Sequence, residues 1–178
     1  MHREPERMNP SPTFFEEALN RYERPLIGYA RSFTRDLESA RDIVQDVFLR
    51  LSQNLSGVDP HRLAPWLFTV CRNLAVDHQR KHHRLVPMEA ELLELEASPE
   101  PGPSEAAESR ETAATLRALL EQLPDRQREA MRLKFIAGLS YQQISDAMQT
   151  SIGNVGYLIH HGVQSMREKW TAQEAVGA

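Results

Sequence analysis

The sequence has a single cysteine, no long apolar run and no segment with the alternating pattern of a β-strand. One thiol, that of Cys71, excludes an internal disulfide framework and a zinc site of four thiolates, and it fits a reducing cytoplasm. No apolar stretch approaches the roughly 20 residues that span a bilayer, and the segment MHREPERMNPSP lacks the apolar core of a signal peptide. We therefore expect a soluble, cytoplasmic, all-α protein that does not insert into membranes.

Charge is unevenly distributed along the chain. The net charge of the 178 residues is −4, yet residues 86–111 hold eight Glu and one Arg, so the rest carries 20 basic and 17 acidic side chains, a balance of +3. The acidic segment contains four Pro and no aromatic residue, which is typical of a tether that buries too little apolar surface to fold. We expect a flexible linker; the alternative is that Leu92, Leu93 and Leu95 dock on a partner.

Helical periodicity and helix-start signals occur on both sides of this linker. They predict helices at about 13–34, 38–53 and 65–83, and then at about 110–122, 126–137, 141–148 and 152–169. The expected organisation is an N-terminal tail (1–12), a three-helix domain (13–85), the acidic linker (86–111), a second helical domain (112–170) and a C-terminal tail (171–178).

The second expected helix has one apolar stripe and one polar face. Spacings of three and four place Ala40, Ile43, Val44, Val47, Phe48 and Leu51 on the buried side. The opposite side carries Asp42, Gln45, Asp46 and Leu49. Two carboxylates beside an exposed leucine indicate a docking surface for a basic partner; the alternative is an ordinary solvated acidic face.

The third expected helix carries a polar and basic face. This face consists of Asn73, Asp77, Arg80 and Arg84, which are spaced by four, three and four residues. Arg72 and Lys81 lie at its flanks. Such side chains suit phosphates and unstacked bases. Trp66 and Phe68 stand nearby, beside the loop SGVDPHRLA, and are more typical of a core than of a stacking platform.

The end of the chain has the pattern of a helix-turn-helix. Gly138 is expected to end one helix, Ser140 and Gln143 to cap the next, and Ser151 to cap the last. The last helix should bury Ile152, Val155, Ile159, Val163, Met166 and Trp170. Its outward face should then carry Asn154, Tyr157, His161 and Gln164, with Leu158 and His160 at the flanks.

This outward face contains hydrogen-bonding side chains but no Lys or Arg. It can read base edges but attracts DNA weakly, because attraction depends mainly on neutralised phosphates. Arg126, Arg128, Arg132 and Lys134 are the local candidates for that attraction, with Arg167 and Lys169 beyond the face. The alternative is a helical hairpin that touches no DNA.

Four segments in series resemble the extracytoplasmic-function group of bacterial sigma factors. They are ESARDIVQDVFLRL, PWLFTVCRNLAVDHQRKHHR, the acidic linker, and LPDRQREAMRLKFIAGLSYQQISDAM. The resemblance covers about residues 13–170. It implies that the first domain is sigma region two and the last is sigma region four, in an alternative sigma factor that directs promoter recognition, promoter melting and transcription initiation.

The resemblance also implies partners and roles for named residues. Core RNA polymerase would be contacted at its clamp helices by Asp42, Gln45, Asp46 and Leu49, and at its flap by the last domain. The minus-ten element of promoter DNA would be bound by Asp59, His61, Arg62, Asn73, Asp77, Arg80 and Arg84. The minus-thirty-five element would be bound by Ser151, Asn154, Tyr157, His160 and His161. An anti-sigma protein is a further candidate partner, and no cofactor is expected.

Two other classes of protein are alternatives. A dimeric regulator that binds duplex DNA through its last domain would leave the acidic face and the basic third helix unexplained. A metal site could use Cys71, His78, His82 and His83, but the last two side chains diverge from the others around the helix. No carboxylate pair, nucleophile–base set or phosphate loop indicates an enzyme.

Overall fold

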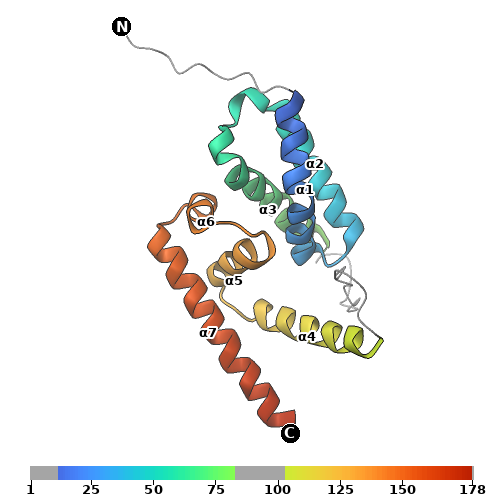
Figure 1. The fold of residues 1–178 in the computed structure, drawn as a ribbon, viewed down its shortest axis with the longest axis vertical. Helices are drawn as coiled ribbons and strands as arrows, with labels where there is room; N and C mark the ends of the chain where they lie inside the picture. Colours follow the sequence, from blue (N-terminus) through green and yellow to red (C-terminus); the bar gives the residue numbers. More distant parts are fainter. Residues whose placement is uncertain (1–11, 83–102, 178) are drawn as a thin grey trace.

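The chain folds into two helical units that pack against each other (Figure 1). The computed structural model describes residues 12–82 and 103–177, and all regular elements in these ranges are helical, which confirms the all-α prediction. The N-terminal bundle comprises α1 (Pro12–Thr34), α2 (Leu37–Gln53) and α3 (Leu63–His82). The C-terminal domain comprises α4 (Pro103–Glu121), α5 (Asp125–Met131), α6 (Tyr141–Met148) and α7 (Ile152–Gly177).

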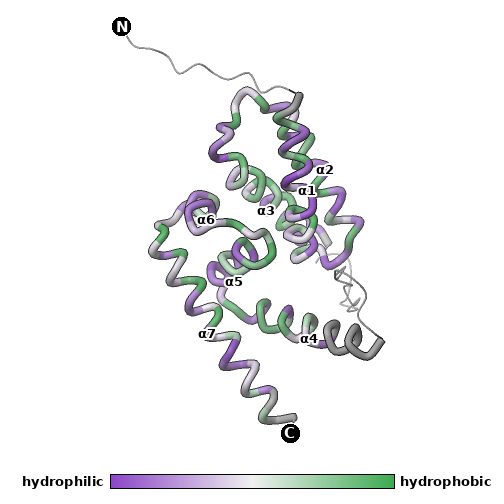
Figure 2. Tube along the Cα trace, viewed as in Figure 1, coloured by the Kyte–Doolittle hydropathy of each residue, from purple (hydrophilic) through white to green (hydrophobic). Residues whose placement is uncertain are grey.

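The N-terminal bundle is built around the stripe expected on α2. Asp36 starts this helix by accepting a 2.7 Å hydrogen bond from the Ser39 amide. All six side chains predicted to be inward are buried, and each contributes about 1–3 kcal/mol of apolar burial. Hydrophobic and hydrophilic residues accordingly alternate along the helix in Figure 2. Two short 3₁₀ turns, η1 (Leu55–Gly57) and η2 (Pro60–Arg62), connect α2 to α3.

The predicted turn signals of the C-terminal domain are present. Ser140 Oγ accepts from the Gln143 amide at 3.2 Å, and the Gln143 side chain accepts from the Ser140 amide at 2.9 Å, which is a complete capping box. Gly138 has a φ of +71°, the left-handed conformation that ends a helix. Ser151 Oγ accepts from the Asn154 amide at 3.1 Å and so caps α7.

Three helix boundaries differ from the sequence prediction. The helix α4 begins at Pro103, before the expected start near residue 110, and α7 continues to Gly177 instead of ending near residue 169. The expected single helix at 126–137 is α5 followed by a π-helical turn, η3 (Arg132–Ile136), in which the Ala137 amide donates to the Arg132 carbonyl. Residues 86–102 of the expected linker lie outside the described residues.

The buried face predicted for α7 is partly wrong. Ile152 and Val163 are exposed, whereas Leu158, expected near the outward face, is buried with Val155 and Ile159. The reason is Gly162, where an added Cβ would lie 2.9 Å from Cγ of Met131. The helix crosses α5 closely at a residue that hydrophobic periodicity does not count, and this contact sets its rotation.

Among the described residues, no helix is long and apolar enough to cross a membrane.

Candidate nucleic-acid and protein interfaces

The outward face of α2 has the arrangement that its spacing predicted. Asp42, Gln45, Asp46 and Leu49 are all exposed on the side opposite the core, and Leu49 is 55% exposed. An apolar side chain between two carboxylates can bury itself against a partner while the charges select a basic one. The face is therefore available for docking without any rearrangement of the bundle.

The polar face of α3 is also available. Asn73, Asp77 and Arg80 are exposed, and Arg80 forms a 3.8 Å ion pair with Asp77 in which both side chains are largely in solvent. Such a pair contributes little to stability, so either side chain can exchange its partner for a ligand group. The fourth predicted member of this face, Arg84, lies outside the described residues.

The loop before α3 is ordered by its own side chains. Asp59 Oδ1 accepts from the His61 amide at 2.9 Å and caps η2, leaving His61 and Arg62 exposed. The nearby aromatics serve the core, as expected: Phe68 is buried against Tyr29, with ring centroids 5.3 Å apart, and Trp66 is half-buried. The loop thus presents imidazole and guanidinium groups at the start of α3.

The start of α7 exposes an aromatic cluster. Tyr157 is 57% exposed, and its ring centroid lies 4.1 Å from that of His161, which is 5.5 Å from His160. Asn154 is half-buried, and its Nδ2 donates to Thr150 Oγ1 at 2.8 Å. Ser151, Tyr157 and His160 are therefore the exposed members of the five predicted residues, while Ser151 and Asn154 also stabilise the start of the helix.

Arg132 does not supply the basic attraction that the sequence suggested. It is 5% exposed, because its guanidinium lies over the Phe33 ring, 4.1 Å from the centroid. Arg128 is held by Glu121 and Asp125, and Lys134 lies near the Leu139 carbonyl and the Tyr141 ring. Arg126 and Arg167 are the exposed members of that set.

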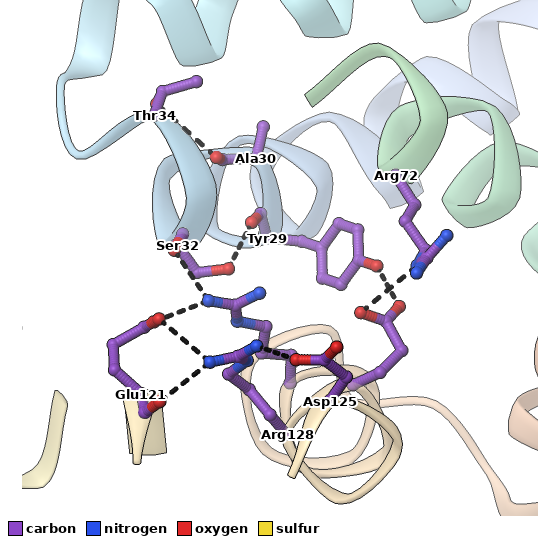
Figure 3. Close-up of polar contacts among 10 residues, drawn as sticks. Tyr29, Ala30, Ser32, Thr34, Arg72, Glu121, Asp125 and Arg128 are labelled. Atoms are coloured by element: carbon purple, nitrogen blue, oxygen red, sulfur yellow. Dashed lines mark hydrogen bonds and ion pairs between the residues drawn. The ribbon is translucent and has the colours of Figure 1, made fainter. Parts of the chain in front are cut away.

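Sequence reasoning missed a polar cluster between the two domains, shown in Figure 3. Glu129 on α5 is buried; its carboxylate accepts a short hydrogen bond from the Tyr29 hydroxyl on α1 and lies 3.5 Å from the Arg72 guanidinium on α3. Arg132 donates to the Ser32 carbonyl on α1 at 3.2 Å. The sequence did carry a signal for this cluster. Glu129 and Arg132 are charged residues that flank or interrupt the apolar stretch AMRL at 130–133.

Burial perturbs two acids beside this cluster. Desolvation, with a smaller contribution from Glu129, raises the pKa of the Cys71 thiol to about 12. Desolvation and then Glu129 raise the pKa of Tyr29 well above its usual value. The thiol therefore stays protonated at neutral pH and is a poor metal ligand. Within residues 12–82 and 103–177, no three His, Cys, Asp or Glu residues form a metal-binding group.

A groove of about 1450 Å³ lies beside the contact between the domains. It is lined by parts of α1, α4, η3 and α7, and Phe135 at its edge is 62% exposed. Arg31 and Arg117 both line it, and the pKa of Arg117 is lowered by desolvation and then by Arg31. The groove therefore combines apolar and cationic lining.

Two protein-family models match the two structural units. Residues 18–85 match Sigma-70 region 2, and residues 113–166 match Sigma-70, region 4. The first match covers most of the N-terminal bundle and the second covers most of the C-terminal domain. The fold and its surfaces thus define a sigma factor of bacterial RNA polymerase with these two regions.

Similarity to curated relatives identifies the group of sigma factors. The ECF RNA polymerase sigma factor SigM of Bacillus subtilis is 28% identical over 153 residues, which is 85% of this chain and 92% of that protein. The ECF RNA polymerase sigma factor EcfG of Rhodopseudomonas palustris is 31% identical over 131 residues, 73% of this chain and 70% of that one. The chain belongs to the extracytoplasmic-function group of sigma factors. It is an alternative sigma factor that directs promoter recognition and transcription initiation.

Solved structures share the fold. CnrH in complex with the cytosolic domain of CnrY has a TM-score of 0.65 at 22% identity, covering 91% of this chain and 90% of that one. The sigma factor RpoE of Bartonella quintana, in complex with the anti-sigma factor NepR, has a TM-score of 0.63 at 22% identity, covering 86% and 94%.

Proposed function

We propose that this sigma factor docks on the clamp helices of core RNA polymerase through the outward face of α2. The observation that carries this proposal is the exposed set of Asp42, Gln45, Asp46 and Leu49, opposite a fully packed core. The C-terminal domain contacts the flap of the same enzyme. The chain acts by binding, without catalysis of its own, and it acts in the cytoplasm, where the bacterial polymerase works.

The α3 face and the loop before it capture the melted strand of the minus-ten element. Asn73, Arg80 and Arg62 are exposed and can bond phosphates and base edges. Asp77 forms only a weak, solvent-exposed ion pair with Arg80, which a DNA phosphate can replace. The expected organisation into regions 13–85 and 112–170 provides one DNA-binding surface in each domain.

The first turns of α7 read the minus-thirty-five element. Tyr157 and His160 are exposed, and the exposed Ser151 with Asn154 fixes the helix start that presents them. Few cations lie on this face, so the polymerase and the minus-ten contact must add to the attraction. Two weak contacts on one assembly reinforce each other through a high local concentration.

The test of these two DNA surfaces is an open-complex assay with holoenzyme and a promoter carrying a fluorescent base in the minus-ten element. Asn73→Ala and Arg80→Ala should reduce strand opening while duplex binding persists. Tyr157→Ala should reduce duplex binding. Gln53→Ala, at an exposed site outside both surfaces, serves as the control. Equal activity of all four variants would refute the assignment of these residues to the two DNA-binding surfaces.

An acidic, amphipathic anti-sigma segment is the partner that fits the groove between α1 and α4. Support comes from the exposed Phe135, which suits an apolar side chain, and from the lining residues Arg31 and Arg117, which suit carboxylates. One structural neighbour was solved in complex with the cytosolic domain of CnrY, and another in complex with the anti-sigma factor NepR. Phe135→Ser should weaken capture of this partner and leave core binding unchanged.

A further inference from the structure

Three aromatic rings lie together on the first turns of α7. Tyr157 and His161 are four residues apart and so share one side of the helix, with ring centroids 4.1 Å apart. The ring of His160 meets that of His161 edge-on, at a centroid distance of 5.5 Å. Tyr157 and His160 are exposed and His161 is half-buried. These three side chains are called the ring cluster below.

The ring cluster lies outside the core of the C-terminal domain. The side of α7 that packs into this core carries Val155, Leu158 and Ile159, which are buried. Packing within the chain therefore leaves the rings accessible, and in the proposed function the same turns of α7 lie against the minus-thirty-five element. The chemistry of the rings then decides how this part of the helix meets DNA.

The two histidines are the only source of positive charge on this part of α7. Residues 152–166 contain no Lys, Arg, Asp or Glu. Duplex DNA carries one negative charge for about every 1.7 Å of its axis. Imidazole is the side chain that ordinarily changes its charge between about pH 5 and pH 8. This surface is therefore neutral when His160 and His161 are neutral, and cationic when they are protonated.

The charged and titratable groups around the ring cluster belong to α7 itself and to the three helices packed on it, α4, α5 and α6. Those whose described partners are other residues are Glu121, Asp125, Arg128, Glu129, Tyr141, Asp146, Glu168 and Lys169. Arg117 lines the groove, and Glu111, Arg126 and Arg167 are exposed. Within residues 12–82 and 103–177, no carboxylate forms an ion pair with either imidazole. An anionic ligand can therefore serve as the counter-ion of these histidines.

We propose that His160 and His161 hold the minus-thirty-five element as imidazolium cations, so that this contact takes up protons and tightens as pH falls. The inference rests on the proposed function, because it requires the first turns of α7 to lie against promoter DNA. A phosphate beside an imidazole favours the protonated form. By linkage, protons then favour the DNA-bound form to the same extent. The contact is strongest at acidic pH and weakens as pH rises through the histidine range.

The spacing of the two imidazoles strengthens this coupling. Two cations with ring centroids 5.5 Å apart repel each other, and phosphates beside them offset that repulsion. Protonation also changes the hydrogen bonds that the surface can make. A neutral imidazole has one donor and one acceptor, whereas an imidazolium has two donors. Two donors suit phosphate oxygens and the N7 and O6 acceptors of guanine.

The experiment measures the affinity of holoenzyme for a fluorescent duplex. The duplex carries the upstream element of a start site found by run-off transcription and lacks the downstream element. Anisotropy titrations at about pH 6 and about pH 8 span the range in which imidazole changes its charge. We expect wild type to bind at least about tenfold more tightly at the lower pH, since each proton taken up contributes up to about tenfold per pH unit. The salt dependence should also be steeper there, by about 0.9 in the logarithmic slope for each phosphate neutralised.

Two double variants isolate the histidines from every other titrating group of the holoenzyme. His160→Gln with His161→Gln keeps polar side chains but removes the imidazoles, and it should lose the pH dependence. His160→Lys with His161→Lys keeps the charge at both pH values, so it should bind at the higher pH as tightly as wild type binds at the lower. Gln173→His is the matched control, because it adds an imidazole at an exposed site of α7 beyond the first turns. It should show the pH dependence of wild type.

The outcomes separate this inference from the proposed function. Equal pH dependence in wild type and in the double glutamine variant would overturn the inference, as would a loss of pH dependence in Gln173→His. Wild-type holoenzyme that binds the duplex no better than core polymerase at either pH would refute the proposed function. Binding that Tyr157→Ala weakens, but that pH leaves unchanged in wild type, would refute the proton-linked contact alone.

Discussion

Two groups of carboxylates in this chain have opposite environments. Asp42 and Asp46 lie in solvent on α2 beside an exposed leucine, whereas Glu129 is 7% exposed between two domains. A carboxylate is costly to bury unless it is paired, so Glu129 already has its partners within the chain, in Tyr29 and Arg72. The acids of α2 remain available to another protein. The functional group is the same, and its exposure decides whether it contacts another protein or another part of the same chain.

The largest effect is expected when the charge of the two exposed α2 carboxylates is reversed. Asp42→Lys with Asp46→Lys should weaken binding to core polymerase by at least about 30-fold, in line with the loss of an interface hot spot of about 2 kcal/mol. The free energy of unfolding should change by less than about 0.5 kcal/mol, because both sites are exposed. Competition binding and thermal melting measure the two quantities.

Glu17→Lys is the control for this charge reversal, since Glu17 is an exposed acid on α1. It should leave core binding within twofold of wild type, by the same small effect of exposed substitutions, about 0.5 kcal/mol. Equal losses in both variants would mean that net charge, and not the α2 face, governs the association.

A smaller effect, on the stability of the C-terminal domain, is expected from substitutions on the inner and outer faces of α7. Gly162→Leu should destabilise the C-terminal domain by about 1–3 kcal/mol, because the added side chain overlaps Met131. Gly156→Ala meets only ordinary contact with Tyr141 and should stabilise the helix by up to about 1 kcal/mol. Calorimetric melting of both variants measures the difference, and a stable Gly162→Leu variant would contradict the close crossing at this residue.

The smallest effect concerns the acids buried near Glu129. The pKa of Cys71 is about 12 in the folded chain and 9.0 in an exposed thiol, so the folded state retains a proton that the unfolded state releases. The stabilising contribution is complete below pH about 9 and is lost as pH rises, by about 1 kcal/mol between pH 9 and pH 10. Tyr29 adds in the same direction at higher pH.

Urea unfolding at several alkaline pH values, with alkylation of Cys71 as a second readout, tests this expectation. Alkylation should be slow in the native chain and fast in denaturant. Rapid alkylation of the native chain at mildly alkaline pH would show that the thiol is accessible and that its pKa is ordinary.

The same comparison explains which features the sequence could predict. The periodicity of α2 predicted all six buried residues, because this helix buries one side against the other helices of the same bundle. The capping signals at Ser140 and Ser151 depend on neighbours within three residues, and both were correct. Local signals were sufficient where the contacts are local.

The parts that the sequence could not predict depend on long-range contacts. Arg132 belongs to a basic helix by composition, and only its position over Phe33 removes it from the surface. The rotation of α7 follows from the fit between Gly162 and Met131. Periodicity describes the face that a helix could bury, but the partner decides which part of that face is covered.

The most direct test of the central claim is run-off transcription with bacterial core RNA polymerase, with and without this chain, on a library of genomic fragments. The account predicts new start sites that share two spaced promoter elements, and it predicts that Asp42→Lys with Asp46→Lys abolishes them. No new initiation, together with salt-sensitive duplex binding by the chain alone, would contradict the account and indicate a regulator that works without core polymerase.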